Sequence, residues 1–198
     1  MKKIVFCLGI FLSLCFSQSP SDEEKMDELC ENGDANICYA LGKMNERSGM
    51  LLQSKNTPES RIYYKKAASL YQEQCENNDY VSCSIAGNMY INDQGVNVNH
   101  FKAKEFFSKA CENDNQDGCV GLGKLHLSGI SARKDGNMAK KYFEDACEKK
   151  NQNGCLFLAQ MYQNGDGVSK SKKLAKEFFG KACDFDSAIG CAEYANMK

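Results

Sequence analysis

The stretch Cys147-Glu148-Lys149-Lys150-Asn151-Gln152-Asn153-Gly154-Cys155 places two cysteines eight positions apart around a polar segment. The same spacing recurs along the chain of 198 residues, in Cys30 and Cys38, Cys75 and Cys83, Cys111 and Cys119, Cys147 and Cys155, and Cys183 and Cys191. The last four pairs follow at intervals of 36 residues, and the first stands 45 residues ahead of the second. A fixed period of this length is typical of stacked helix pairs, in which each unit buries its apolar face against its neighbours.

The spacing within each pair indicates a chain reversal. In one continuous helix, residues eight positions apart lie about 12 Å apart, whereas the Cα atoms of a disulfide lie about 4.4–6.8 Å apart. The residues between the cysteines are rich in Asn, Asp, Gly and Ser, which end one helix and cap the next. Bonded cysteines would therefore clamp the end of one helix to the start of an antiparallel helix.

The first 17 residues are interpreted as an export signal. Lys2 and Lys3 precede an apolar run from Ile4 to Phe16, which is short for a membrane span. Removal of the signal takes Cys7 and Cys15 with it and leaves ten cysteines. An even number in a secreted or periplasmic protein favours five disulfides, pairing the two cysteines of each unit; free buried cysteines are the remaining alternative.

Composition excludes several classes of function. The net charge is −1, with 26% charged and 42% hydrophobic residues, so there is no basic footprint for nucleic acid or an anionic membrane. Structural zinc sites usually take cysteines two to four residues apart, and His100 and His126 are the only histidines. We expect no metal, no cofactor, no membrane insertion after signal removal, and a monomer.

The segments between the cysteine pairs repeat an amphipathic helical pattern. Ala103, Phe107 and Ala110 follow i, i+4, i+7 spacing and share one helix face. We expect a core built from these residues and their equivalents, which are Ala67, Phe106, Ala139, Tyr142, Phe143, Ala146, Ala175, Phe178, Phe179 and Ala182. His126 holds the register of Tyr90 and Tyr162, so it is interpreted as a packing substitute for tyrosine.

These signals predict an all-α array forming a single domain over residues 18–198. The expected repeats cover about 22–56, 57–92, 93–128, 129–164 and 165–198, with nine helices in all. Ser21-Asp22-Glu23-Glu24 is a capping box that begins the first helix. Thr57-Pro58-Glu59 begins another after an insert, with threonine as N-cap and proline at N1.

The run from Leu158 to Val168, followed by Lys173 to Ala182, resembles the Sel-one-like repeat family, a relative of the tetratricopeptide repeat. The cysteine pair in each repeat and the export signal make the chain similar to the secreted Helicobacter cysteine-rich proteins. The resemblance covers essentially the whole mature chain. It implies a right-handed superhelix of disulfide-bridged α/α hairpins. It also implies penicillin binding and weak β-lactamase activity, or a host-interacting, peptide-binding role.

No catalytic residues can be named for such an activity. Ser131-x-x-Lys134 and Ser169-x-x-Lys172 match the first motif of serine β-lactamases, at about the frequency expected by chance, and the Ser-Asp-Asn and Lys-Thr-Gly partners are absent from the sequence. Hydrolysis of β-lactam small molecules would therefore use a site that the sequence does not reveal.

The alternative is a scaffold that binds extended peptide or protein segments in a concave groove. The position five residues after each second cysteine is polar in every repeat, and we expect this register to line the groove: Lys43, Asn88, Lys124, Gln160 and Asn196. A solvated helix face explains the same pattern. The lysines at 170, 172, 173 and 176 likewise suit either a solvated surface or a docking patch for an acidic partner.

Overall fold

The computed structural model describes residues 21–48, 57–130 and 134–197, and the predicted export signal lies outside these ranges. The described residues form ten α-helices and no strand. The helices are α1 (Asp22–Glu31), α2 (Ala35–Ser48), α3 (Pro58–Glu76), α4 (Tyr80–Ile91), α5 (His100–Glu112), α6 (Gln116–Ser128), α7 (Gly136–Glu148), α8 (Gln152–Asn164), α9 (Lys172–Asp184) and α10 (Ala188–Asn196).

The prediction of nine helices was wrong by one. Ser187 accepts a hydrogen bond from the backbone N–H of Gly190, and this cap starts α10 as a full helix antiparallel to α9. The last unit is therefore a complete hairpin, like the four before it.

Each predicted cysteine pair forms a disulfide between the end of an odd-numbered helix and the start of the next even-numbered helix. The bonds and their Cα–Cα distances are Cys30 to Cys38 (4.8 Å), Cys75 to Cys83 (4.7 Å), Cys111 to Cys119 (4.6 Å), Cys147 to Cys155 (4.5 Å) and Cys183 to Cys191 (4.5 Å). These distances require the predicted chain reversal, since one helix would hold the cysteines about 12 Å apart.

The alternative of free buried cysteines is wrong for these ten positions. The ten cysteines also differ in how far they are buried. Cys38 and Cys119 are buried at the starts of α2 and α6. Cys191 is half-buried at the start of α10, the last described helix, which packs mainly against α9. The bond to Cys183 joins the start of this helix to the end of α9.

The turn inside each pair is built the same way five times. The third residue after the first cysteine has a positive φ, as in Gly33 (96°), Asn78 (69°) and Lys150 (64°). The next residue caps the following helix; for example, the Asp79 carboxylate accepts hydrogen bonds from the N–H groups of Val81 and Ser82. The turn chemistry predicted from Asn, Asp, Gly and Ser is confirmed.

The helix starts predicted from capping residues are also confirmed. Ser21 and Glu24 form a reciprocal capping box at α1. Thr57 caps α3 through a hydrogen bond from the Ser60 N–H, with Pro58 at the first helical position.

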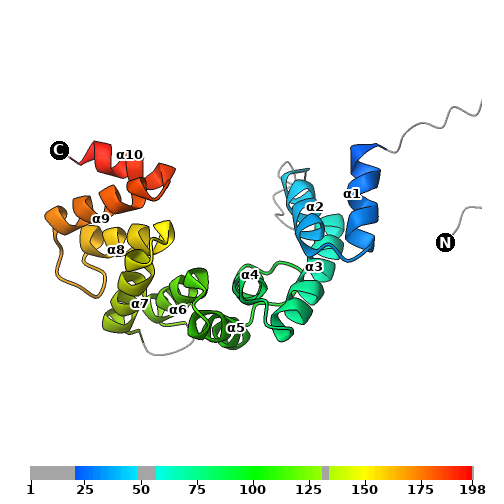
Figure 1. Ribbon diagram of the computed structural model, residues 1–198, viewed down its shortest axis with the longest axis horizontal. Helices are drawn as coiled ribbons and strands as arrows, with labels where there is room; N and C mark the ends of the chain where they lie inside the picture. Colours follow the sequence, from blue (N-terminus) through cyan, green and yellow to red (C-terminus); the bar gives the residue numbers. More distant parts are fainter. Residues whose placement is uncertain (1–20, 49–56, 131–133, 198) are drawn as a thin grey trace, which may run out of the picture.

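The hairpins stack into an arc whose two ends are α1 and α10 (Figure 1). The helices α2, α4, α6 and α8 lie toward the hollow of the arc, and α3, α5, α7 and α9 lie outside it. Direct contacts of α4 with α6 and of α6 with α8 agree with this placement, because helices on the inside of a curve approach each other more closely. The fold is a solenoid of helical hairpins.

The core runs along the solenoid, as expected from the repeated alanines and aromatics. Ala103, Phe107, Phe143 and Phe179 are 0% exposed. A Cβ added to Gly87 would lie 2.6 Å from the Phe107 ring, so the ring sits directly on the backbone of α4. Small residues in the even-numbered helices therefore leave room for the aromatic side chains of the next helix to pack against the backbone.

The loops between hairpins are held by close backbone packing. Gly167, with φ 73°, lies in the loop between α8 and α9, and its added Cβ would lie 2.4 Å from the Cα atom of Gly136 at the start of α7. Glycine is required at this loop both by the left-handed conformation and by the approach of two backbones.

Candidate functional site: the concave surface

The five predicted groove residues lie on α2, α4, α6, α8 and α10, one on each even-numbered helix. Lys43, Lys124 and Asn196 are exposed, whereas Asn88 and Gln160 are half-buried. The helices α2 to α8 that carry four of these side chains face the hollow of the arc (Figure 1). That these side chains line a groove stays a prediction.

Two of these residues meet in one cavity. Lys124 of α6 and Gln160 of α8 both line a pocket of about 360 Å³ between these neighbouring helices. The rest of its wall combines polar and apolar side chains: Leu127, Ser128, Lys134, Phe157, Met161, Asn164 and Asp166. Lys43, Asn88 and Asn196 do not line this pocket.

The pocket has an aromatic wall that the sequence pattern did not reveal. Phe157 stacks on Phe143 with ring centroids 5.4 Å apart, and the Lys124 Nζ lies 5.5 Å from the centroid of the Phe157 ring. Equivalent positions hold residues as different as Ile85 and Gly121, so no repeated register marks this site. The sequence feature that could have indicated the pocket is the aromatic residue Phe157 itself, because the equivalent position holds no aromatic residue in the other repeats.

Polar groups around the ring can recognise both charge and peptide bonds. Lys124 and Lys134 supply cations, Asp166 supplies an anion, and Gln160 and Asn164 supply amides that donate and accept hydrogen bonds. A half-open cavity with an apolar wall and a few convergent polar groups is the usual character of a ligand site.

Asn88 fits the other explanation of the polar register, in which these side chains bind solvent or their own helix and no ligand. Its Nδ2 donates to the carbonyl oxygen of Ser84 on the same helix, at 3.0 Å. Lys43 lies above the ring of Tyr39, with Nζ 5.7 Å from the centroid. These two groove residues therefore already have intramolecular contacts, and they are separated from the α6–α8 pocket along the arc.

His126, which the sequence pattern interprets as a packing substitute for tyrosine, packs in the same way as Tyr90 and Tyr162. His126 stacks on Tyr142 with centroids 5.7 Å apart, matching the 5.7 Å of Tyr90–Phe106 and the 5.8 Å of Tyr162–Phe178. Among the residues that the structure describes, no group of three or more His, Cys, Asp or Glu side chains could hold a metal ion.

Only one of the two serine–lysine motifs lies wholly within the described residues. Ser131 lies outside the described residues. Ser169 and Lys172 are both exposed around the start of α9, whereas activation of a nucleophile requires a base held within hydrogen-bond reach in a shielded environment. Within residues 21–48, 57–130 and 134–197, no helix is long and apolar enough to cross a bilayer.

Comparison with known protein families gives one match, repeated along the chain. The model of the Sel1 repeat matches residues 37–71, 82–115, 116–151 and 152–184. Each matched repeat starts near the beginning of an even-numbered helix and takes in the odd-numbered helix after it. The three middle disulfides consequently join the second helix of one repeat to the first helix of the next, whereas Cys30 in α1 and Cys191 in α10 lie outside the matched repeats.

Several solved structures share the fold. Helicobacter pylori cysteine rich protein B (hcpB) is 32% identical, with a TM-score of 0.52, over 67% of this chain and 95% of that chain. The Sel1 repeat protein from Oxalobacter formigenes is 18% identical, with a TM-score of 0.65, over 88% of this chain and 66% of that chain.

The protective antigen c5321 of uropathogenic Escherichia coli is 22% identical, with a TM-score of 0.62. The match covers 88% of this chain but spans only 36% of the antigen. A search of curated protein sequences gives no significant match.

Proposed function

The chain belongs to the Sel1 repeat family, among the Helicobacter cysteine-rich proteins, and we propose that it is a scaffold that binds an extended peptide segment of a partner protein on its concave surface. The observation that carries this proposal is the pocket between α6 and α8. It joins two residues of the repeated polar register, Lys124 and Gln160, to the Phe157 ring.

The chemistry of the pocket suits a peptide segment. The Gln160 amide can donate to a peptide carbonyl and accept from a peptide N–H. Lys124 and Lys134 can pair with a carboxylate of the segment, and Phe157 offers an apolar surface to one of its side chains. Helix-pair solenoids present such surfaces along several repeats, so further contacts can add along the inner side of the arc.

We place this function in the periplasm or outside the cell. The five disulfides support this location, because disulfides form and persist in oxidising compartments and are rare in the cytosol. The basic and apolar start of the sequence, read as an export signal, supports the same location.

A matched pair of variants tests the groove. We expect a Lys124→Ala/Gln160→Ala protein to lose capture of segments selected from a displayed peptide library on the wild-type protein, since both side chains line the pocket. Lys43→Ala/Asn196→Ala changes the same register outside the pocket and should retain capture. Thermal unfolding followed by circular dichroism checks that both proteins keep their fold. Equal capture by both variants would contradict the proposal.

Hydrolysis of β-lactams, which the family resemblance implies, is the second candidate function. Of the two serine–lysine motifs, only Ser169-x-x-Lys172 lies wholly within the described residues, and both of its side chains are exposed to solvent. Turnover of a chromogenic cephalosporin by the oxidised protein tests this activity directly. A rate that disappears as purification proceeds would exclude it, and slow turnover that follows the protein would establish it.

A further inference from the structure

We call the region between one odd-numbered helix and the next odd-numbered helix a joint. A lysine bridges three of the four joints, which are α1–α3, α3–α5, α5–α7 and α7–α9. In each case a lysine of the later hairpin reaches an acceptor at the end of the earlier odd-numbered helix or in the turn after it. The contacts are Lys66 to Glu31 (2.9 Å), Lys109 to the Cys75 carbonyl oxygen (2.6 Å) and Lys149 to Asp114 (2.7 Å).

The fourth joint, between α7 and α9, has no such bridge among the described residues. Phe185 stands where Lys149 stands one repeat earlier, so the cation is replaced by an aromatic ring. Lys181 holds the register of Lys109, but its Nζ pairs with Glu177 on its own helix at 3.0 Å and lies 4.7 Å from the centroid of the Phe178 ring.

A cavity of about 300 Å³ occupies this joint. Its wall consists of Glu144, Cys147 and Glu148 from α7 and Phe178, Lys181 and Phe185 from α9 and its C-cap. These residues lie outside the concave surface, since α7 and α9 are on the outer side of the arc (Figure 1). The site is separate from the α6–α8 pocket, with which it shares no residue.

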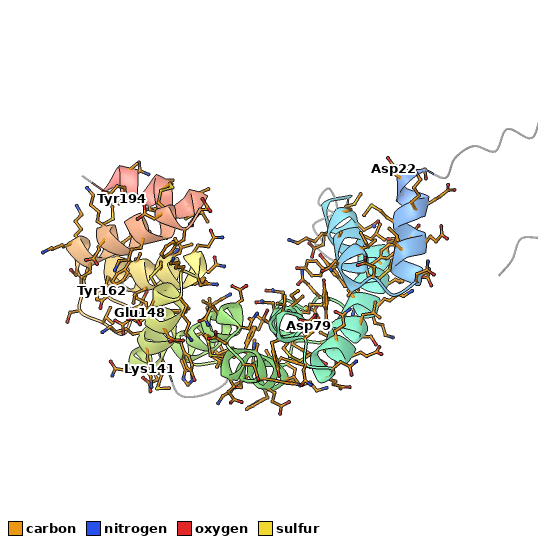
Figure 2. The ribbon with its side chains drawn as sticks, in the orientation of Figure 1. Asp22, Asp79, Lys141, Glu148, Tyr162 and Tyr194 are labelled. Atoms are coloured by element: carbon orange, nitrogen blue, oxygen red, sulfur yellow. A yellow bond between two sulfur atoms is a disulfide. The ribbon has the colours of Figure 1, made fainter. Side chains whose placement is uncertain are left out.

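The charges in the cavity leave one carboxylate available. Glu144 pairs with Lys140 at 3.2 Å, and Lys181 pairs with Glu177. Glu148, at the end of α7, has no ion pair within the described part of the chain. Its side chain is exposed and therefore accessible (Figure 2). The ring of Phe185 has no cation above it among those residues.

We propose that this cavity is a docking site for a lysine or arginine side chain of a partner protein. The partner's cation takes the place that a lysine of the chain's own next hairpin takes in the three other joints. Its charge pairs with Glu148, and its methylene stem and charged head lie against the Phe185 ring.

Lys181 opposes this binding, because it contributes a positive charge to the same wall. Its contacts with Glu177 and Phe178 hold that charge on α9. Removing it should strengthen the binding of a cation, whereas removing Glu148 should weaken it. These opposite signs distinguish recognition of charge from simple filling of an apolar cavity.

The test is an NMR titration of the ¹⁵N-labelled full chain at low salt. The probe is Nα-acetyl-lysine N-methylamide, and its uncharged control is the norleucine analogue. We expect shifts for amides at the end of α7 and along α9 with the lysine probe only. Similar shifts at these amides with both probes, or shifts confined to other parts of the chain, would overturn the proposal.

Variants sharpen the result. Glu148→Gln should weaken probe binding about threefold, and Lys181→Gln should strengthen it by a similar factor, as expected for exposed charge pairs. Glu112→Gln is the matched control, because Glu112 holds the same register one joint earlier, where Lys149 already forms the bridge. Unchanged binding in Glu148→Gln, or equal weakening in both glutamate variants, would refute the site. The amide spectra of the free variants verify their fold.

Discussion

Residues with positive φ are the points at which the chain is forced into hairpins. Lys150 adopts φ 64° although it is not one of the residue types that favour this region. The left-handed conformation costs an L-residue with a Cβ roughly 1–2 kcal/mol. It is imposed by the surroundings, since the Cys147–Cys155 disulfide and the Asn151 cap fix the chain on both sides. Substitution of Lys150 by glycine is therefore a natural stabilising change.

Gly167 provides a prediction at this scale. A Cβ at this position would lie 2.4 Å from the Gly136 Cα atom, and φ is 73°. We expect Gly167→Ala to lower the free energy of unfolding by about 2–4 kcal/mol, since backbone strain and overpacking add.

Gly165 is the matched control for this change. It has φ 82°, but its added Cβ would approach no atom closer than 3.5 Å. Gly165→Ala should thus cost about 1–2 kcal/mol, for the left-handed conformation alone. Urea unfolding followed by circular dichroism gives both values, and equal losses would contradict the backbone contact.

The sequence allowed these turns, the core and the cysteine pairing to be predicted because each repeats at a fixed register. Ala103 and Phe107 have equivalents 36 residues on, and all of them are buried. Phe157 and Phe185 could not be predicted as parts of cavities, since each breaks the pattern at its position. Residues that repeat at a fixed register therefore predict the fold, whereas Phe157 and Phe185, which line the two cavities, differ from the residues at the equivalent positions of the other repeats.

At the scale of elements, the disulfides reinforce the weaker helix contacts. The helix pairs within one Sel1 repeat, such as α2 with α3 and α8 with α9, pack more extensively than the pairs joined by a disulfide, such as α3 with α4. The covalent bond thus lies between consecutive repeats, where side-chain packing contributes less.

We expect loss of one internal disulfide to be costly. The double variant Cys147→Ala and Cys155→Ala opens a loop of about nine residues, which corresponds to about 2–3 kcal/mol on the chain-entropy model. Urea unfolding of the variant and of the wild type measures the difference. The double variant Cys183→Ala and Cys191→Ala is the comparison at the last hairpin, and it should leave hydrogen exchange of α2 to α6 unchanged. Faster exchange in those helices would show that the solenoid unfolds as one unit.

A tyrosine ties α1 to α3 in a pH-dependent way. The Tyr63 hydroxyl donates to the Asp27 carboxylate at 2.7 Å, and this hydrogen bond, with burial, raises the pKa of Tyr63 to about 12. The unfolded phenol has a pKa of about 10. The contribution of the Tyr63 hydrogen bond to the free energy of unfolding is therefore complete below about pH 10, and it is lost as the pH rises through about 12.

Tyr63→Phe should consequently lower the unfolding free energy by about 0.5–1 kcal/mol at neutral pH, as for a single partly exposed hydrogen bond. The difference from the wild type should narrow between about pH 9 and pH 11. Chemical denaturation at both values measures it, and a gap that widens with pH would refute the assignment.

At the scale of the whole molecule, the buried residues of the described helices form several clusters along the solenoid, each made by neighbouring repeats. Contacts run between consecutive helices and between neighbouring repeats, so stability is a sum of local terms. The five disulfides bridge every second connection between the described helices, from α1–α2 to α9–α10. We expect reduction by a thiol reagent to lower the melting temperature sharply, and detection of ten free thiols in the native protein would contradict the pairing.

The exposed turns within the cystine loops have a further consequence for a protein that meets proteases. Asn77, Asn78 and Asp79 are exposed between Cys75 and Cys83, and the other turns are built alike. A cut at such a turn separates the two helices in sequence, but the disulfide beside it still joins them. The nicked chain stays one covalent molecule with its register intact, and fragments appear on a gel only after reduction.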